Sequence, residues 1–531
     1  MSLTARLDRL ALSRPHYKLL LIGGLGYSFD GMDGAVVAFL LPRIQELWGL
    51  NTASLGLVGS AAPFGFFFGA ILAGWMGDRF GRKKVMLWAL AFYCVMSVVA
   101  AMAPPNFEVF LIARIFAGLG AGAESVIIAP FLSEFIPPRR RGWFIGTLAG
   151  FFSFGFVGAA LIGRFVVPLG EDGWRWAQVI TAIPILLLLW WRRSLPESPR
   201  YLISRGRIAE ATEVVDGFEQ SVVKATGKPL APLPPAEEEI TKHEQKISIW
   251  NALKFMWSKA MRRRTAVIWL IWFVITFSYY GFFSWIPTLL VGRGITITKS
   301  FEFSILIYLA QIPGYFSAAW LCDRIDRKNT IALYLAGSAI SAFWLSQSND
   351  SGMILVAAAT LSFFLNGTYA GVYAYTPELF PTWMRATGVG LASAVGRIGS
   401  ILAPSIIGIF AASLGFGGVF TMTTVVLTIG VLGVMIFGAS TAGKSLEDIT
   451  PAPNMTRPRQ EASESDECRR SFPADLRCNP AGTRSRSVHR PAVDSGTLQP
   501  EAPFHQPPGR IPGRRREDRR DLPPRLVGNG H

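Results

Sequence analysis

Two charged clusters of this chain, each set between long apolar runs, occur a second time further along. The letters GDRFGRKK at 77–84 return in degraded form as CDRIDRK at 322–328, and a cluster around Glu134 returns around Glu378. The Asp of the first cluster precedes the Glu of the second by 56 positions in the first copy and by 55 in the second. Because self-similarity at a fixed distance marks a repeated architecture, we predict two similar halves.

The apolar runs predict the environment of these halves. Apolar residues make up 50% of the chain. A helix of about 20 apolar residues crosses a bilayer. Twelve runs of this kind lie at 18–41, 54–76, 85–103, 107–132, 144–169, 176–191, 265–291, 301–322, 330–347, 352–376, 387–412 and 418–440. The sequence therefore predicts an all-α integral membrane protein with twelve transmembrane helices in two six-helix, pseudo-symmetric halves.

The runs also divide the chain into domains. We predict an N-terminal half at 1–199, a cytoplasmic linker with helical stretches at 200–264, and a C-terminal half at 265–440. Residues 441–531 are rich in Arg and Pro and lack apolar periodicity, which predicts a disordered tail. That composition fits a regulatory or lipid-binding segment, and it also fits out-of-frame codons appended by a frameshift. It favours the second.

Basic residues are divided unequally between alternate loops. One set of loops carries those of 79–84, 139–141, 192–264, 324–328 and Arg385. The other set carries Arg43, Arg164, Arg175, Arg293 and Lys299. The positive-inside rule places the first set and both termini in the cytoplasm, as in a multi-pass protein of the inner (plasma) membrane. Loops that face anionic lipid explain the net charge of +16, so nucleic-acid binding is not expected.

The cytoplasmic motifs resemble those of a known superfamily. The letters at 77–84 resemble the loop 2–3 signature of the major facilitator superfamily. Motifs at 134–142, 196–200, 378–388 and 443–448 resemble those of its sugar-porter and organic-ion branch. The resemblance covers residues 15–449 and implies a secondary transporter that works by alternating access.

The same resemblance implies that charged cytoplasmic residues gate the pathway. Charge-assisted pairs between neighbouring helix ends would close the inner side and break when it opens. The residues assigned to this role are Asp78, Arg79, Arg82, Glu134, Arg141, Glu197, Arg200, Asp323, Arg324, Glu378 and Arg385. The alternative is that they serve topology and folding alone.

Polar groups inside the apolar runs are costly in a bilayer and are functional candidates for that reason. The first run holds Asp30 and Asp33, three positions apart and so on one helix face, and the fourth holds Arg114 and Glu124. The motif around Asp30 resembles that of aromatic-acid/proton symporters, and Glu124 resembles an acid of niacin-type transporters. We predict a proton-coupling site here. The alternative is that one Asp merely pairs with Arg114.

Residues in the second half indicate the substrate. Arg397 has no acidic residue within its own run, so it is expected to meet a distant carboxylate or an anionic substrate. Tyr279 and Tyr280 could stack on a ring, with ordinary packing as the alternative. Asn366 is a further polar candidate. The seventh run lacks the amide pattern that a sugar requires, which favours a small organic anion.

These features predict a proton-coupled symporter of a small, aromatic carboxylate, such as a niacin-like or hydroxybenzoate-like acid. Its expected partners are that substrate, protons and the lipid bilayer, and we expect a monomer. A sugar or polyol symporter is the alternative within the class, and a nutrient receptor that does not transport is the alternative from another class. The four cysteines show no metal spacing, and no motif indicates an enzyme or a cofactor.

The loop charges generate a test of topology. Single cysteines at Ala53, Glu171 and Asp350 should react with a membrane-impermeant reagent added outside, because these loops are predicted to be external. Cysteines at Gly81, Arg140 and Lys328 should be protected in intact cells. Two or more reversals would contradict twelve spans with both ends inside.

Overall fold

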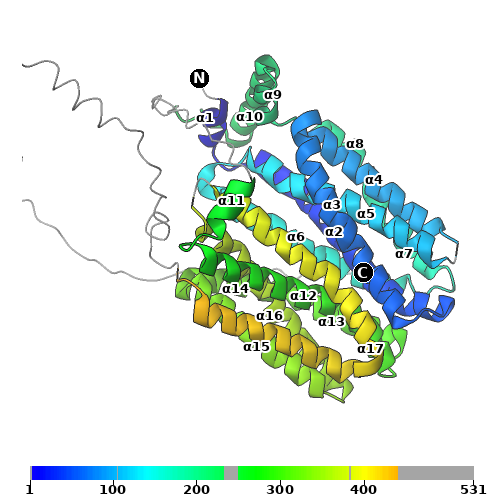
Figure 1. Ribbon diagram of the computed structural model, residues 1–531. Helices are drawn as coiled ribbons and strands as arrows, with labels where there is room; N and C mark the ends of the chain where they lie inside the picture. The colour runs from blue at the N-terminus through cyan, green and yellow to red at the C-terminus, as the bar shows by residue number, and fades with distance from the viewer. Residues whose placement is uncertain (1–2, 105, 233–248, 382–383, 441–531) are drawn as a thin grey trace, which may run out of the picture. The chain divides into compact units, whose positions relative to one another are not determined.

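The computed structural model describes residues 3–104, 106–232, 249–381 and 384–440, which all belong to one compact unit, Met1–Pro453. These residues are helical and contain no strand (Figure 1). The helices before the linker are α1 (Leu3–Asp8), α2 (Arg14–Trp48), α3 (Thr52–Phe80), α4 (Arg82–Met102), α5 (Phe107–Ser133), α6 (Pro138–Phe165), α7 (Gly173–Thr181), the 3-10 helix η1 (Ile183–Leu186) and α8 (Leu187–Ser194). The linker helices are α9 (Pro199–Ser204), α10 (Ile208–Thr226) and α11 (Ile249–Met256). The later helices are α12 (Arg262–Gly292), α13 (Ile297–Leu309), α14 (Gln311–Ile325), α15 (Arg327–Gln347), α16 (Ser351–Glu378) and α17 (Arg385–Phe437).

Eight helical segments of the described residues are long and apolar enough to cross a membrane. Each predicted apolar run coincides with helical structure, but the runs and the helices do not correspond one to one. The sixth run is broken into α7, η1 and α8, with Pro184 inside η1. The last two runs form α17, and Gly415, with φ 61° and ψ −170°, interrupts its helical geometry. The chain turns back there (yellow to orange in Figure 1). The number twelve therefore stays a prediction.

The two copies of the first charged cluster adopt the same backbone geometry. Gly81, between α3 and α4, has φ 100° and ψ 145°, and Asp326, between α14 and α15, has φ 108° and ψ 140°. Asp326 is the non-glycine residue with a positive φ among the described residues, a conformation that suits glycine and costs other residues energy. The repeat in the sequence is thus a repeat in the backbone.

Helices α3 and α5 approach each other so closely that their contact requires glycine. A Cβ atom on Gly65 would lie 1.8 Å from the Ile115 carbonyl oxygen, and one on Gly122 would lie 2.3 Å from the Phe66 carbonyl oxygen. Small residues at such positions let backbones meet and increase van der Waals contact in a membrane. The two helices therefore form one rigid pair.

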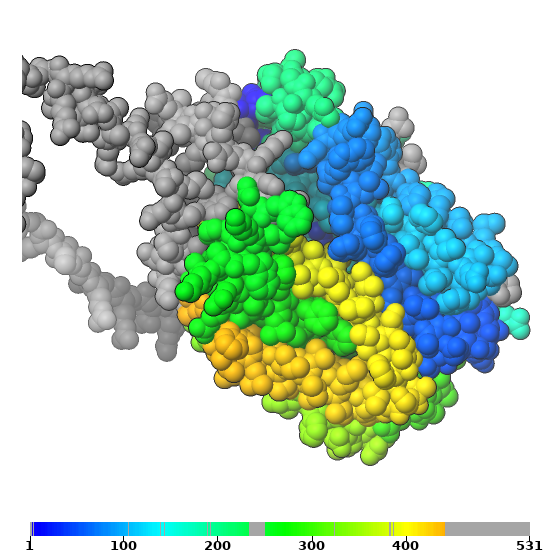
Figure 2. Space-filling model, viewed as in Figure 1, coloured from blue at the N-terminus to red at the C-terminus, as the bar shows by residue number. Residues whose placement is uncertain are grey.

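Helices α3 and α17 join the first half to the second. A Cβ on Gly56 would lie 2.6 Å from the Pro404 carbonyl oxygen, and Ser60 Oγ donates to the Ile401 carbonyl oxygen at 2.6 Å. Figure 2 shows α3 (blue) beside α17 (yellow) on this face. A second link between the halves is the ion pair of Arg164 and Glu302, at 2.8 Å. Both links lie toward the loops that we predict to be external.

The linker helix α10 packs on the amino-terminal helix α1 through charged groups. Arg6 pairs with Asp216 and Glu219, and Arg9 lies 2.8 Å from the Glu219 carboxylate. Burial alone would raise the pKa of Glu219, but hydrogen bonds from Arg6 and Arg9 outweigh it and hold this pKa below its ordinary value. The predicted helical stretch of the linker is confirmed here.

Candidate functional site

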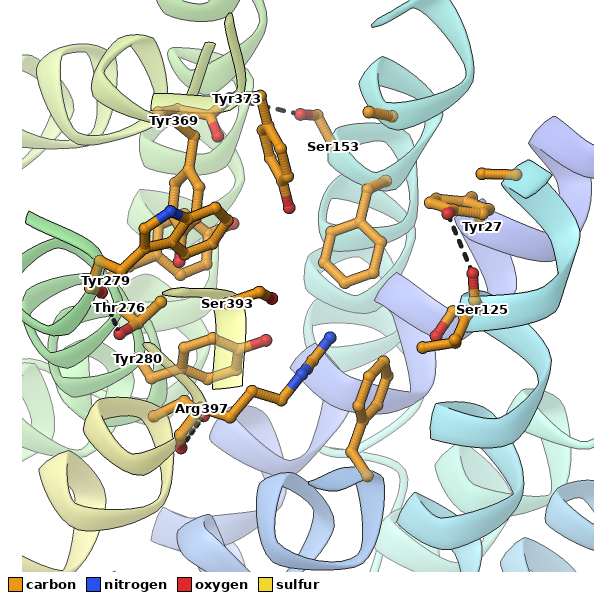
Figure 3. A pocket seen from close by; sticks show the side chains of 18 of the residues that line it. Tyr27, Ser125, Ser153, Thr276, Tyr279, Tyr280, Tyr369, Tyr373, Ser393 and Arg397 are labelled. Carbon is orange, nitrogen blue, oxygen red and sulfur yellow. Dashed lines mark hydrogen bonds between the residues drawn. The ribbon is translucent and has the colours of Figure 1, made fainter. Parts of the chain in front are cut away.

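A cavity of about 330 Å³ lies between the first and the second half of the chain. Helices α2, α3, α5 and α6 contribute one wall, and α12, α14, α16 and α17 the other (Figure 3). Its lining residues are Tyr27, Phe66, Ser125, Val126, Ala129, Ala149, Phe152, Ser153, Trp272, Thr276, Tyr279, Tyr280, Tyr315, Asn366, Tyr369, Tyr373, Ser393, Arg397 and Ser400. Nine of these nineteen residues are aromatic, and a pocket with apolar and aromatic walls and some polar groups is the usual form of a small-molecule site.

Aromatic side chains of the second half make the largest part of the wall. The Tyr279 ring lies 5.1 Å from the Tyr369 ring, edge to face, and Trp272 lies 5.4 Å from Tyr373. Such pairs are stable in themselves and also leave ring faces and edges for a ligand. Tyr373, which lies five positions before the end of α16, is 51% exposed.

Arg397 is the one charged side chain that the described residues contribute to the cavity lining. Figure 3 shows its guanidinium pointing from α17 into the space between the halves. Its Cζ atom lies 3.8 Å from the centroid of the Phe66 ring. None of the ion pairs among the described residues includes it. A fixed positive charge in an aromatic pocket can bind a carboxylate with two parallel hydrogen bonds.

Asn366 and Tyr279 are partly satisfied by the protein itself. Asn366 Nδ2 donates to the Gln311 carbonyl oxygen at 2.9 Å, and the Tyr279 hydroxyl donates to Gln311 Oε1 at 3.1 Å. The Asn366 amide also approaches Ser153 Oγ across the halves, at 3.4 Å. Both residues line the cavity, and hydrogen bonds to Gln311 at the start of α14 orient their side chains.

The predicted acidic residues lie outside this cavity, in a buried cluster of the first half. Arg114 Nη1 donates to Asp33 Oδ1 at 3.0 Å, and Arg114 Nη2 donates to the Asp33 carbonyl oxygen at 3.0 Å. Ser97 Oγ also donates to Asp33 Oδ1, and Gln178 Oε1 accepts from Arg114 Nη1. Of the two aspartates, Asp33 is thus the one that pairs with Arg114.

Asp30 and Glu124 have no such partner. Both side chains are buried, at 4% and 0% exposure, and none of their four carboxylate oxygens has a hydrogen-bond partner among the described residues. A buried carboxylate without a partner is costly when ionised. Tyr27, three positions before Asp30 in α2, and Ser125, one position after Glu124 in α5, line the cavity. The Tyr27 hydroxyl donates to the Ser125 carbonyl oxygen at 3.0 Å.

The charged motifs that we predict to face the cytoplasm form compact networks at helix ends. In the first half, Arg82 pairs with Glu134, and Ser198 Oγ donates to the other Glu134 oxygen at 2.6 Å. Glu197 Oε1 accepts from the backbone N–H groups of Lys83 and Ser198. In the second half, Arg327 lies 3.0 Å from Glu378. Because Arg327 and Arg82 occupy equivalent positions of the repeat, the two halves contain equivalent ion pairs.

Other residues assigned to gating differ in their contacts. Arg141 donates to the Ser133 and Ile136 carbonyl oxygens and lies 3.4 Å from Asp8. Arg324 lies over the Trp320 ring, with its Cζ 4.6 Å from the centroid. Asp78, Arg79 and Arg200 are exposed, and Arg385 is partly buried. The Asp323 side chain lies outside the part of the chain that the structure describes.

Sequence reasoning missed several residues of the cavity, above all Phe66, Trp272, Tyr369 and Tyr373. A signal was present in the spacing. In three helices the lining residues recur at a spacing of three or four positions, which places them on one helix face. They are Trp272, Thr276 and Tyr279 in α12, Asn366, Tyr369 and Tyr373 in α16, and Ser393, Arg397 and Ser400 in α17. Polar and aromatic residues in a stripe along apolar helices thus indicate the side that faces a cavity. Phe66 has no such signal, because Phe64, Phe67 and Phe68 surround it.

Comparison with known proteins identifies the class of this architecture. The model of the sugar (and other) transporter family matches residues 26–452. The niacin transporter NiaP of Acinetobacter baylyi is 38% identical over 85% of this chain and 100% of its own length. The gallate transporter of Pseudomonas putida is 29% identical over 77% of this chain and 89% of its own.

A solved structure shares the fold. The inward-open conformation of the xylose transporter XylE from E. coli superimposes with a TM-score of 0.64 at 19% identity, over 82% of this chain and 99% of that protein. All of these proteins are membrane transporters. The chain belongs to the sugar (and other) transporter family of the major facilitator superfamily.

The ion pair at the inner end of the first half generates a test of gating. Arg82→Ala or Glu134→Ala should slow transport while substrate affinity stays within a few-fold, because neither residue lines the cavity. Initial rates over a range of substrate concentrations separate the two effects. Lys84→Ala, at a neighbouring exposed position, is the matched control. Loss of affinity at unchanged turnover would move the pair into the binding site.

Proposed function

We propose that this protein is a proton-coupled symporter that carries a small, aromatic carboxylate across the inner membrane by alternating access. The observation that carries the proposal is Arg397, the single cation that the described residues contribute to the cavity between the two halves, together with nine aromatic side chains of its lining. A flat anion satisfies both features, because its charge meets the guanidinium and its ring meets the tyrosines.

The size of the cavity and the relatives support this choice of substrate. Its volume of about 330 Å³ falls at the lower end of the range for ligand pockets, which suits a molecule of one ring. Two of the similar proteins are named for niacin and for gallate, both of which are aromatic carboxylates. A monocyclic acid such as niacin is therefore the first substrate to test.

A sugar or polyol is the alternative within the family. It would require several hydrogen-bonding side chains, usually amides, around its hydroxyl groups. Asn366 is the one amide side chain of the lining, and its Nδ2 is already engaged by Gln311. The likeness to a xylose transporter concerns the fold alone. A receptor that does not transport is the alternative outside the class, and the tail through which it would signal lies outside the described residues.

Asp30 and Glu124 are the proposed proton carriers. Both are buried without a partner, whereas Asp33 is neutralised by Arg114. A carboxylate that has no counter-charge can exchange a proton when water reaches it. Its protonation can therefore change as the transporter opens to one side of the membrane and then to the other. The intracellular position of both termini and the monomeric state remain part of the proposal.

The test of the substrate site is the removal of the cation. Arg397→Ala should abolish uptake of radiolabelled niacin into proteoliposomes, and Arg397→Lys should weaken it, because Lys cannot form two parallel bonds. A buried charge-assisted contact contributes roughly 2–5 kcal/mol, which is on the order of 30-fold or more in affinity. Nicotinamide, the neutral analogue, should compete poorly for uptake by the wild type, and purified Arg397→Ala should bind the acid no better than the amide.

Correct insertion of the variants must be checked by surface labelling, with Arg293→Ala, an exposed arginine of the same half, as the matched control. Normal uptake of aromatic acids by well-inserted Arg397→Ala would contradict the proposal. Uptake of neutral sugars alone would replace it with the sugar alternative.

The test of coupling separates accumulation from exchange. Asp30→Asn and Glu124→Gln should each weaken accumulation driven by a pH gradient, because neither amide can carry a proton. At least one variant should keep counterflow exchange, which moves no net proton. Glu108→Gln, an exposed change at the start of the same helix α5, should behave like the wild type. Accumulation at the wild-type level in both variants would show that these carboxylates are not the coupling site.

A further inference from the structure

The Phe66 ring and the Arg397 guanidinium meet across the two halves of the chain. Arg397 Cζ lies 3.8 Å from the ring centroid, and the next shortest cation–ring distance among the described residues is 4.5 Å, at Arg175 and Trp174. An aromatic face attracts a cation electrostatically, and more strongly where water is displaced. Phe66 therefore offers Arg397 the attraction that no acidic group provides within the described residues.

The ring is fixed firmly to the first half. The neighbouring Gly65 packs against the backbone of α5, and a Cβ on Gly122 of α5 would lie 2.6 Å from the Phe66 Cα. Helices α3 and α5 are therefore in close backbone contact at this level. Movement of the first half moves the Phe66 ring with it.

Arg397 is fixed to the second half in the same way. Its neighbour Gly396 packs on α12, where Thr276 Oγ1 donates to the Gly396 carbonyl oxygen at 2.6 Å. One turn further along α17, the carbonyl oxygen of Ile401 accepts the hydrogen bond from Ser60 of α3. The contact of α3 with α17 thus continues from Ser60 to Phe66, where both helices border the cavity.

We propose that Phe66 is a specificity-determining residue, which holds the Arg397 guanidinium in the cavity and so sets the preference of the site for an acid over a neutral analogue. The proposal rests on the proposed function, since it assigns the substrate carboxylate to Arg397. In the empty site the ring face takes the place of a counter-charge. When an acid binds, its carboxylate meets the edge of the same guanidinium while the ring stays on its face.

This geometry also assigns a role to the first half in recognition. Without the ring, the long Arg397 side chain gains rotamer freedom that it must lose again on binding. This loss of rotamer freedom weakens the binding of ligands that contact the guanidinium and does not affect ligands that do not contact it. The effect of Phe66 should therefore be selective for acids, which distinguishes it from a general packing role.

The experiment compares two phenylalanines of one helix. Phe66→Leu removes the ring that touches Arg397, and Phe68→Leu makes the same change at a side chain that is 48% exposed. Niacin uptake and its inhibition by nicotinamide would be measured in proteoliposomes for the wild type and both variants. Phe66→Tyr, which restores a ring face, is the conservative rescue.

Phe66→Leu should raise the half-saturating niacin concentration about tenfold, the loss expected for one desolvated cation–ring contact, while the maximal rate changes less than about threefold. The ratio of nicotinamide to niacin affinity should shift toward one. Phe66→Tyr and Phe68→Leu should both stay within about threefold of the wild type.

The role of Phe66 would be overturned if Phe66→Leu lost the same factor of affinity for niacin and for nicotinamide. It would also be overturned if Phe66→Leu and Phe68→Leu changed niacin affinity equally. Both outcomes would leave the proposed function intact. If Phe66→Leu inserts poorly, niacin binding to detergent-purified Phe66→Tyr decides, because a packing role predicts lost binding from the added hydroxyl. A wild type that takes up no aromatic acid would overturn the proposed function and this proposal together.

Discussion

The cost of an ionised side chain inside a membrane governs the arrangement of this protein. Each such group needs a counter-charge, a proton or contact with water. Arg114 meets the first condition through Asp33, with which it shares two hydrogen bonds. Arg397 borders a cavity and rests on an aromatic ring. Asp30 and Glu124 have no counter-charge and do not line the cavity within the described residues. A bound proton is the remaining way to avoid the cost, which is why we propose them as proton carriers. The different surroundings of these ionisable groups are therefore the basis of the different roles that we propose for them.

Close helix packing holds these groups in place. Gly65 and Gly122 bring α3 and α5 into backbone contact, and Gly396 brings α17 onto α12. The pocket residues therefore belong to two rigid walls, one in each half, that meet along α3 and α17. A cavity between such walls changes its opening when the walls move as bodies, which is the geometry of transporters built from repeats. The ion pairs of Glu134 and Glu378 lie at the ends of these walls rather than in the cavity.

The sequence allowed much of this to be predicted, because charge inside an apolar run is rare and easy to see. Arg397, Asn366, Tyr279 and Tyr280 were predicted from residue type, and all four line one cavity. The separation of the acids from that cavity could not be predicted, since spacing shows that Asp30 and Asp33 share a face but not what that face meets. The contact of Phe66 with Arg397 could not be predicted for a related reason. Phe66 lies among other phenylalanines, and only the packing of α3 on α5 and α17 distinguishes the ring that touches Arg397. The shared backbone conformation of Gly81 and Asp326 was not predicted, because the second copy of the repeat has lost the glycine.

The distance between acids and cavity has a consequence for coupling. If Asp30 and Glu124 carry the proton and Arg397 binds the substrate, the two events occur in different halves and do not share an atom. The connection is the contact of α2 with α5, where the Tyr27 hydroxyl donates to the Ser125 carbonyl oxygen. Both residues line the cavity, and each lies within three positions of one of the acids. Loss of a proton from either acid would place an uncompensated charge between α2 and α5, and the helices must then separate or admit water. This movement would shift the cavity wall opposite Arg397 and so change the binding of the substrate. Coupling therefore requires no direct contact between proton and substrate.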